Sequence, residues 1–91
     1  MNEEILLNQL EELAERLEIL VRDENINIEE SSSSGGLCRV EGKHVIILNS
    51  KATVKEKIQV MIAALHQFDL SGMYVKPVIR ELFDGYKETF Q

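Results

Sequence analysis

The chain has 91 residues, of which 44% are apolar and 29% charged, as in ordinary folded domains. A chain of this length is too short for two hydrophobic cores, so we expect a single domain over residues 1–91. The net charge is −6, and the first thirty residues hold ten acidic and two basic side chains, which would repel a phosphate backbone. Nucleic acid is therefore not an expected partner.

Cysteine usage and hydropathy point to a soluble protein of a reducing compartment. Cys38 is the only cysteine, so no intramolecular disulfide can form. The N-terminus begins with acidic residues, including Glu3 and Glu4, and lacks the basic and apolar regions of a secretory signal. No apolar run approaches the roughly 20 residues that span a bilayer. We therefore expect a cytoplasmic protein that does not bind membranes.

The N-terminal segment has the pattern of an amphipathic helix. Glutamates fill one side of this segment, and leucines recur on the other at spacings of three and four: Leu6, Leu10, Leu13, Leu17 and Leu20. Asn2 is suited to cap the first turn. The end of the helix is ambiguous, because residues 19–24 continue the leucine stripe and also show a β-branched alternation. We predict a strand there.

A β-hairpin is predicted after a flexible loop rich in serine and glycine at about residues 25–36. Its strands are residues 37–40 and 43–48, and Gly42 supplies a positive φ angle at the turn. A two-residue turn places Cys38, Val40, Val45 and Ile47 on one face of the hairpin, and Arg39, His44, Ile46 and Leu48 on the other. A longer turn would change these faces.

Two helices are predicted after the hairpin. Thr53 and Glu56 match a capping box at the start of the first, and Gly72 is a plausible stop for it. Its apolar stripe consists of Val54, Ile58, Met61, Ile62, Leu65 and Phe68. Pro77 suits the first turn of the last helix. Two or three strands flanked by helices give an α+β fold.

The helix after Thr53 has apolar residues on more than one side. Val60 and Ala63 lie off its main stripe, so a second side of this helix can be buried against the sheet, the last helix or another chain. This two-sided character favours contact with a protein partner or with a second copy, and we expect a homodimer.

Three residues are of types that bind metals, namely Cys38, His44 and His66, and a Cys38–His44 pair could support thiol chemistry. No CxxC, HExxH or paired-histidine spacing brings them together, and the alternative is a structural role for each. Arg39 and Arg80 are candidates for contacts to an anionic ligand, with solvated surface charge as the alternative.

The order of Gly35-Gly36, a hairpin with Gly42 at its tip, the Ile46–Asn49 strand end and an amphipathic helix resembles the front half of the ImmA/IrrE-type metallopeptidase domain, over about residues 35–70. In that family the helix carries HExxH, whose histidines bind zinc and whose glutamate activates water. At the corresponding position this chain reads Ala-Ala-Leu-His-Gln over residues 63–67, so both ligands and the base are missing and His66 is one position out of register. The resemblance therefore implies a topology without peptidase activity.

The segment from Gly35 to Lys43 is also similar to a GGLC-x-V-x-G-K segment of short bacterial proteins, in which a helix and a Pro-x-x-Arg segment follow, here Pro77 to Arg80. That similarity implies no activity. We therefore expect a non-catalytic protein-interaction or self-associating module without a cofactor. One alternative is a metal or thiol site at Cys38, His44 and His66. Another is a small enzyme that binds an anionic ligand.

Overall fold

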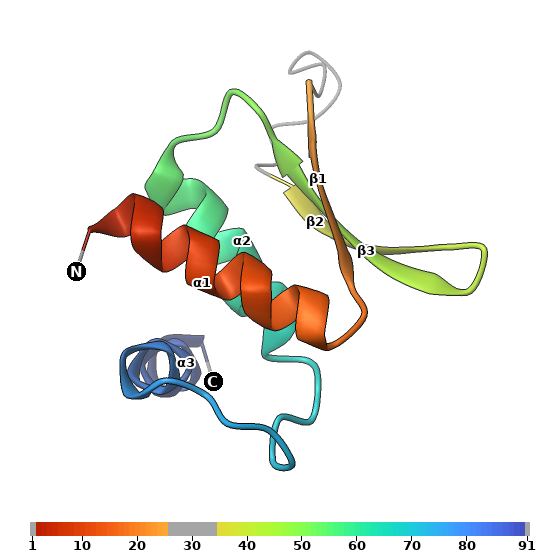
Figure 1. Cartoon of the computed structure of the whole chain (residues 1–91). Coiled ribbons are helices and arrows are strands. Elements are labelled where there is room, and N and C mark those ends of the chain that lie inside the picture. The colour runs from red at the N-terminus through yellow and green to blue at the C-terminus, as the bar shows by residue number, and fades with distance from the viewer. Residues whose placement is uncertain (1, 26–34, 91) are drawn as a thin grey trace.

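The computed structural model describes residues 2–25 and 35–90, which form a three-stranded sheet and three helices (Figure 1). In chain order the elements are α1 (Glu3–Arg16), β1 (Leu20–Glu24), β2 (Gly35–Val40), β3 (Lys43–Asn49), α2 (Val54–Leu65) and α3 (Pro77–Phe90). This is the predicted α+β fold. Residues 26–34 of the expected loop lie outside the described residues, whereas Gly35 and Gly36 belong to β2 instead of that loop.

Helix starts follow the predicted side-chain caps. The Asn2 side chain accepts a hydrogen bond from the Glu4 amide at 2.6 Å at the start of α1. At the start of α2, the Thr53 hydroxyl accepts from the Glu56 amide at 3.1 Å, and the Glu56 carboxylate accepts from the Thr53 amide at 2.9 Å. Each pair satisfies backbone donors that have no partner within the helix, so these caps determine where both helices begin.

Helix α1 ends in a Schellman motif that the leucine spacing does not reveal. The Glu18 amide donates to the Glu15 carbonyl at 3.0 Å, and the Ile19 amide donates to the Ala14 carbonyl at 2.9 Å. Glu18 takes a left-handed φ of 62°, a conformation that usually favours glycine. The chain thus turns out of the helix before Leu20, and the strand predicted at residues 19–24 is confirmed as β1.

The sheet has the order β1-β3-β2, with β1 parallel and β2 antiparallel to the central strand β3. A two-residue turn joins β2 to β3, and its residues Glu41 and Gly42 have φ angles of 51° and 82°, as in a type I′ turn. Val40 therefore pairs with Lys43 and Cys38 with Val45. The faces predicted for a two-residue turn are confirmed.

Helices α1 and α2 pack together on one face of the sheet, and α3 packs against α2 away from the strands (Figure 1). The largest fully buried side chains form the centre of the core between these layers: Leu10, Ile46, Leu48, Met61 and Leu65. The opposite face of the sheet is not covered by any of the described helices. Leu20 and Val40 are exposed on that face.

Helix α2 ends earlier than predicted. Its last residue is Leu65 and His66 is its C-cap, so neither Phe68 nor the expected stop at Gly72 belongs to the helix. Phe68 nevertheless packs against the core from the segment that follows α2, because tertiary contact can bury an apolar side chain without helical geometry.

Within the described residues, none of the helices has the length and apolar character needed to cross a membrane.

Candidate interaction site

The three candidate metal-binding residues lie on different parts of the fold. Cys38 is half-buried on the sheet face that points away from the helices. His44 lies on the helix-facing side, where its ring meets that of Phe68 edge-on with centroids 4.9 Å apart. His66 caps α2, and its ring centroid is 5.1 Å from that of Tyr86. Within residues 2–25 and 35–90, no group of three His, Cys, Asp or Glu side chains could hold a metal ion.

The two candidate anion-binding residues belong to separate elements. Arg39 is exposed on β2 and pairs across the hairpin with His44. Arg80 is exposed in the first turn of α3 and lines a cleft that does not include Arg39. The structure therefore does not bring the two guanidinium groups to one shared cleft.

A groove of about 390 Å³ lies between β2 and α2, and we call it the β2–α2 groove. Its lining comes from three elements: Gly35, Gly36 and Leu37 of β2; Gln59, Val60, Ala63, Ala64 and Gln67 of α2 and the turn after it; and Tyr86 of α3. None of these nine lining residues is charged, although charged residues make up 29% of the chain. The described part of the groove therefore offers no ionic partner to a charged occupant and suits one without charge.

Strand β2 lies at an edge of the sheet beside this groove. The turn at Glu41 and Gly42 makes the Val40–Lys43 pair a hydrogen-bonded one, and hydrogen-bonded and non-hydrogen-bonded pairs alternate from there. By that alternation, the backbone N–H and C=O groups of Leu37 and Arg39 point to the outer edge of the sheet, where no described strand pairs with β2. Such an edge is a template for pairing with another strand.

The second apolar side of α2 faces the groove. Val60 and Ala63 are both half-buried there, between β2 and Tyr86. Gln59 is exposed on the same side, and the Gln67 side chain donates to the Ala63 carbonyl at 3.2 Å. The residues that lie off the main apolar stripe of this helix thus line the groove together with the sheet and α3.

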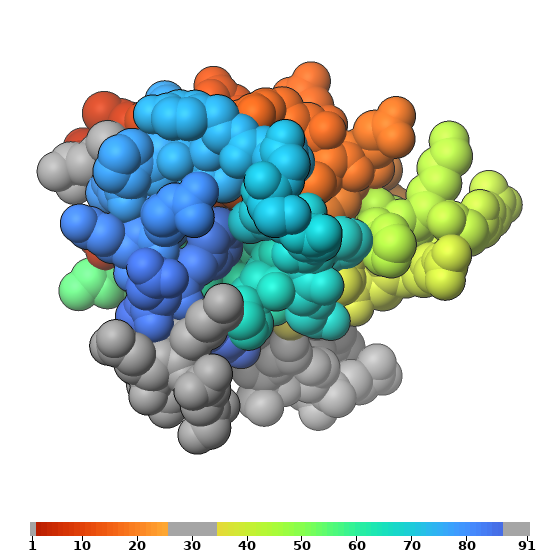
Figure 2. Space-filling view, turned by 90° about the horizontal axis from the view of Figure 1, so that it is seen from below, coloured from red at the N-terminus to blue at the C-terminus, as the bar shows by residue number. Residues whose placement is uncertain are grey.

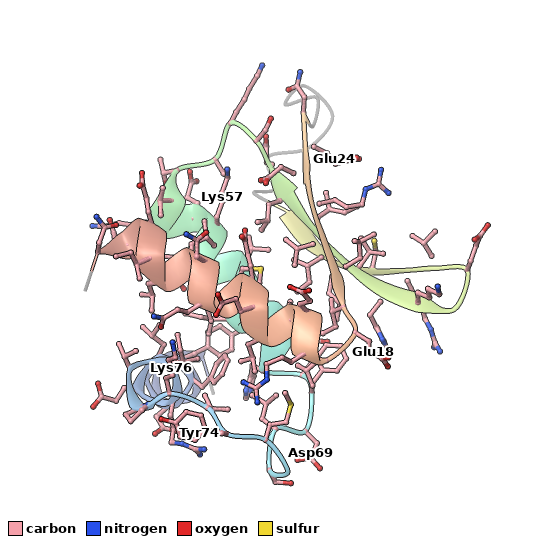
Figure 3. All side chains as sticks on the ribbon, in the orientation of Figure 1. Glu18, Glu24, Lys57, Asp69, Tyr74 and Lys76 are labelled. Atoms are coloured by element: carbon pink, nitrogen blue, oxygen red, sulfur yellow. The ribbon has the colours of Figure 1, made fainter. Side chains whose placement is uncertain are left out.

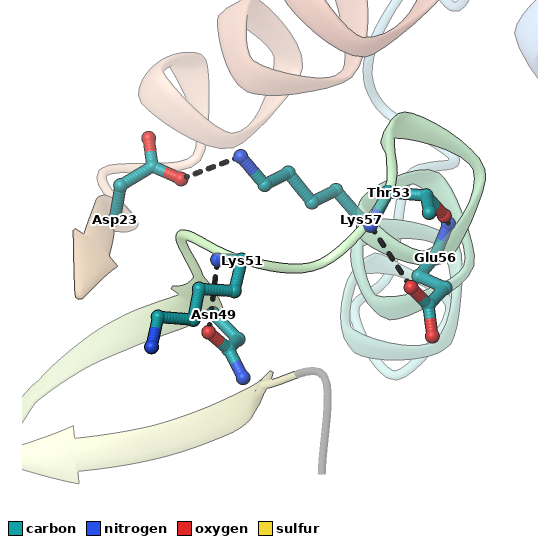
Figure 4. Close-up of polar contacts among 6 residues, drawn as sticks. All are labelled: Asp23, Asn49, Lys51, Thr53, Glu56 and Lys57. Atoms are coloured by element: carbon teal, nitrogen blue, oxygen red, sulfur yellow. Dashed lines mark hydrogen bonds and ion pairs between the residues drawn. The ribbon is translucent and has the colours of Figure 1, made fainter. Parts of the chain in front are cut away.

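The charged end of α2 lies on another side of the molecule. Lys57 reaches across to β1 and forms an ion pair with Asp23 at 3.3 Å (Figure 4). Nearby, burial raises the pKa of Glu11, repulsion by Asp23 raises it further, and Lys57 opposes both effects. In the same close-up, the Asn49 side chain accepts from the Lys51 amide at 3.0 Å. Because β1 and β2 are the two edge strands of the sheet, the acidic side chains of β1 lie at the opposite edge from β2.

Sequence reasoning missed most of the groove, since nothing in the spacing of Gln59, Gln67 and Tyr86 marks them as neighbours. One signal could have found the α2 side: residues 58–68 contain no Asp, Glu, Lys or Arg. No protein-family model, curated protein or solved structure matches the chain. The site therefore has to be interpreted from its own geometry.

Proposed function

We propose that the protein is a non-catalytic interaction module that self-associates, with a second copy pairing along β2 and covering the β2–α2 groove. One observation carries the proposal: within residues 2–25 and 35–90, a strand edge without a pairing strand adjoins a groove without a charged lining residue. A single partner could therefore satisfy the backbone groups of the edge and cover the apolar side chains of the groove at the same time.

The backbone part of the contact is strand pairing. Two β2 strands related by a two-fold axis would run antiparallel, and the outward N–H and C=O groups of Leu37 and Arg39 would bond to the partner strand. The two three-stranded sheets would then become one of six strands. An isologous contact of this kind closes on itself and yields a dimer instead of a filament.

The side-chain part of the contact explains why a second copy suits the groove. A charged segment would lose water in the groove without gaining an ionic partner there. The same surface on a second copy is equally uncharged. At the centre of the α2 side, Ala63 is small enough to let two helices approach closely, and Gln59 offers an amide for hydrogen bonding.

Long-range repulsion is also weakest on this side. The net charge of −6 opposes self-association in general. The first thirty residues hold most of the acidic side chains, and those that are described lie on α1, on β1 and, for Glu18, in the turn between them. Because β1 forms the other edge of the sheet, pairing through β2 keeps these acids away from the contact.

Sedimentation velocity at chain concentrations from micromolar to millimolar tests the proposal, and a concentration-dependent dimer is expected. Ala63→Glu places a charge in the contact and is expected to weaken dimerisation by about 100-fold. Its control is Asn8→Glu, which adds the same charge to an exposed position of α1. Arg39→Pro removes an outward N–H and is also expected to give monomers, whereas Arg39→Ala keeps that donor and the dimer.

Circular dichroism confirms that each variant is folded before its mass is interpreted. A wild-type chain that stays monomeric at the highest concentration overturns the proposal. So does a dimer that persists in folded Ala63→Glu and Arg39→Pro chains, because the contact would then lie elsewhere. Loss of the dimer in the Asn8→Glu control would show that net charge, and not the groove, governs association.

A further inference from the structure

A second cleft, which we call the α3 cleft, lies between α3 and the segment that follows α2 and has a volume of about 310 Å³. Figure 2 looks onto this side of the molecule, where the blue surface of α3 adjoins the teal and cyan surface of residues around the end of α2. Its apolar lining includes Phe68, Leu70 and Phe83. Its polar lining includes Asp69, Arg80 and Asp84, with His66 beside them. The cleft therefore combines an apolar wall with charges of both signs.

The negative side of the cleft is held in position by the chain itself. Asp69 lies on the segment after α2 (Figure 3), and its carboxylate accepts a hydrogen bond from the Ser71 amide at 3.0 Å. Hydrogen bonds from Ser71 lower the pKa of Asp69, so this carboxylate is ionised at neutral pH. A ligand with a positive group would find a fixed anion there.

The positive side of the cleft is Arg80. Asp84 follows it by four residues on α3, so both side chains lie on one face of the helix. Among the described residues, the ion pairs are Arg22 with Glu24 and Lys57 with Asp23, and neither involves Arg80 or Asp84. The Arg80 guanidinium can therefore bind a carboxylate from a ligand, for which its planar fork is well matched.

We propose that the α3 cleft binds a free α-amino acid with an apolar side chain. The ligand carboxylate would bind Arg80, its ammonium group would bind Asp69 or Asp84, and its side chain would lie against Phe68 and Phe83. An anion alone would meet two carboxylates, and a cation alone would meet a guanidinium. A zwitterion finds an opposite charge for each of its groups.

The size of the cleft agrees with this class of ligand. Binding sites for drug-sized molecules have volumes of about 300–1,000 Å³, and the α3 cleft is at the lower limit of that range. A single amino acid with an apolar side chain fits within such a volume. The α3 cleft and the β2–α2 groove share no lining residue, so binding in the cleft can be tested separately from self-association.

Calorimetric and NMR titrations with L-leucine and L-phenylalanine test the proposal. Three matched probes each lack one feature: N-acetyl-L-leucine lacks the ammonium group, L-leucinamide lacks the carboxylate, and glycine lacks the apolar side chain. We expect leucine to bind at least about tenfold more tightly than any of the three. Arg80→Gln is expected to weaken leucine binding about tenfold or more, while Arg39→Gln, outside the cleft, leaves it unchanged.

The monomeric variant Ala63→Glu is expected to bind leucine as the wild type does, which separates this site from the dimer contact. The proposal is overturned if neither leucine nor phenylalanine binds. It is also overturned if N-acetyl-L-leucine or L-leucinamide binds as tightly as leucine, since the pairing of both charges would then be irrelevant. Unchanged leucine binding by folded Arg80→Gln would likewise refute the assigned role of this residue.

Discussion

Gly35 is the first residue of β2 and one position where this fold requires glycine. Its φ of 136° is a conformation that residues with a side chain rarely adopt. A Cβ atom added there would overlap the carbonyl oxygen of Ile47 and lie 3.0 Å from the Cα atom of Leu48. Both of these neighbours belong to β3, which is paired on both sides and cannot easily move. Gly35→Ala must therefore distort the centre of the sheet.

The cost of Gly35→Ala has two parts. A side chain in a sparsely populated backbone conformation costs about 1–3 kcal/mol. Displacing the Ile47 carbonyl adds to this cost, so we expect a loss of about 3 kcal/mol or more in the free energy of unfolding. For a domain of this size, that corresponds to a fall of about 12–24 °C in Tm.

The neighbouring glycine provides a matched control. A Cβ atom added to Gly36 meets no atom within 4 Å. Gly36→Ala is therefore expected to be neutral or to stabilise the fold by about 0.4–1 kcal/mol, because alanine reduces the freedom of the unfolded chain.

Thermal and urea unfolding followed by circular dichroism measure this difference for Gly35→Ala, Gly36→Ala and the wild type. All three chains are compared at one concentration, since self-association makes Tm depend on concentration. If Gly35→Ala unfolds at the wild-type temperature, the close approach of β2 to β3 at Gly35 is wrong. Equal losses in the two variants would show that β2 tolerates no side chain at either position for some other reason.

Three further predictions concern other parts of the fold and use the same unfolding assay. Glu18→Gly relieves the left-handed φ of 62° and should stabilise the chain by about 1 kcal/mol, whereas an unchanged Tm would argue against the Schellman motif. Thr53→Ala removes the side-chain cap of α2 and should cost about 1 kcal/mol, with exposed Lys55→Ala as the neutral control. Burial and Asp23 raise the pKa of Glu11 above its ordinary value of 4.5, so the Glu11 carboxyl binds a proton more tightly in the folded than in the unfolded chain. The free energy of unfolding therefore falls as the pH rises from the unfolded-state pKa of Glu11 through its higher folded-state pKa. Glu11→Gln should therefore be more stable than the wild type at about pH 7 and equal to it at about pH 3; a difference that persists in acid would contradict this reasoning.

Local chemistry makes much of the fold predictable from the sequence. The caps at Asn2 and Thr53 depend on residues two or three positions away, and the turn at Gly42 depends on two central residues. The alternation of the hairpin follows from the length of that turn: two residues assign Cys38 and His44 to opposite faces, and the register of the structure selects this length over a longer turn. Signals of this kind lie within a few residues of the positions that they control.

Helix ends are harder to predict, because tertiary contacts stabilise conformations that local preference disfavours. Glu18 adopts a left-handed conformation that usually favours glycine, and this ends α1 ahead of Leu20. Helix α2 stops at Leu65, although the apolar spacing extends to Phe68, and Phe68 reaches the core from the next segment. In both cases an apolar side chain just beyond the helix end packs into the core, Ile19 after α1 and Phe68 after α2, and spacing alone does not encode that contact.

The sequence by itself determined the α+β class, the starts of the helices, a hairpin with Gly42 at its turn, and the apolar residues Val60 and Ala63 on a second side of α2. Only the tertiary structure decided that β1 pairs in parallel with β3, that β2 forms the open edge, and that Cys38, His44 and His66 lie apart. It also brought the uncharged side of α2 against that edge, and Arg80 and Asp69 into one cleft. The physical reason is that sheet order and clefts arise from contacts between segments distant in the chain, where burial of apolar surface selects the partner and no single segment carries that information.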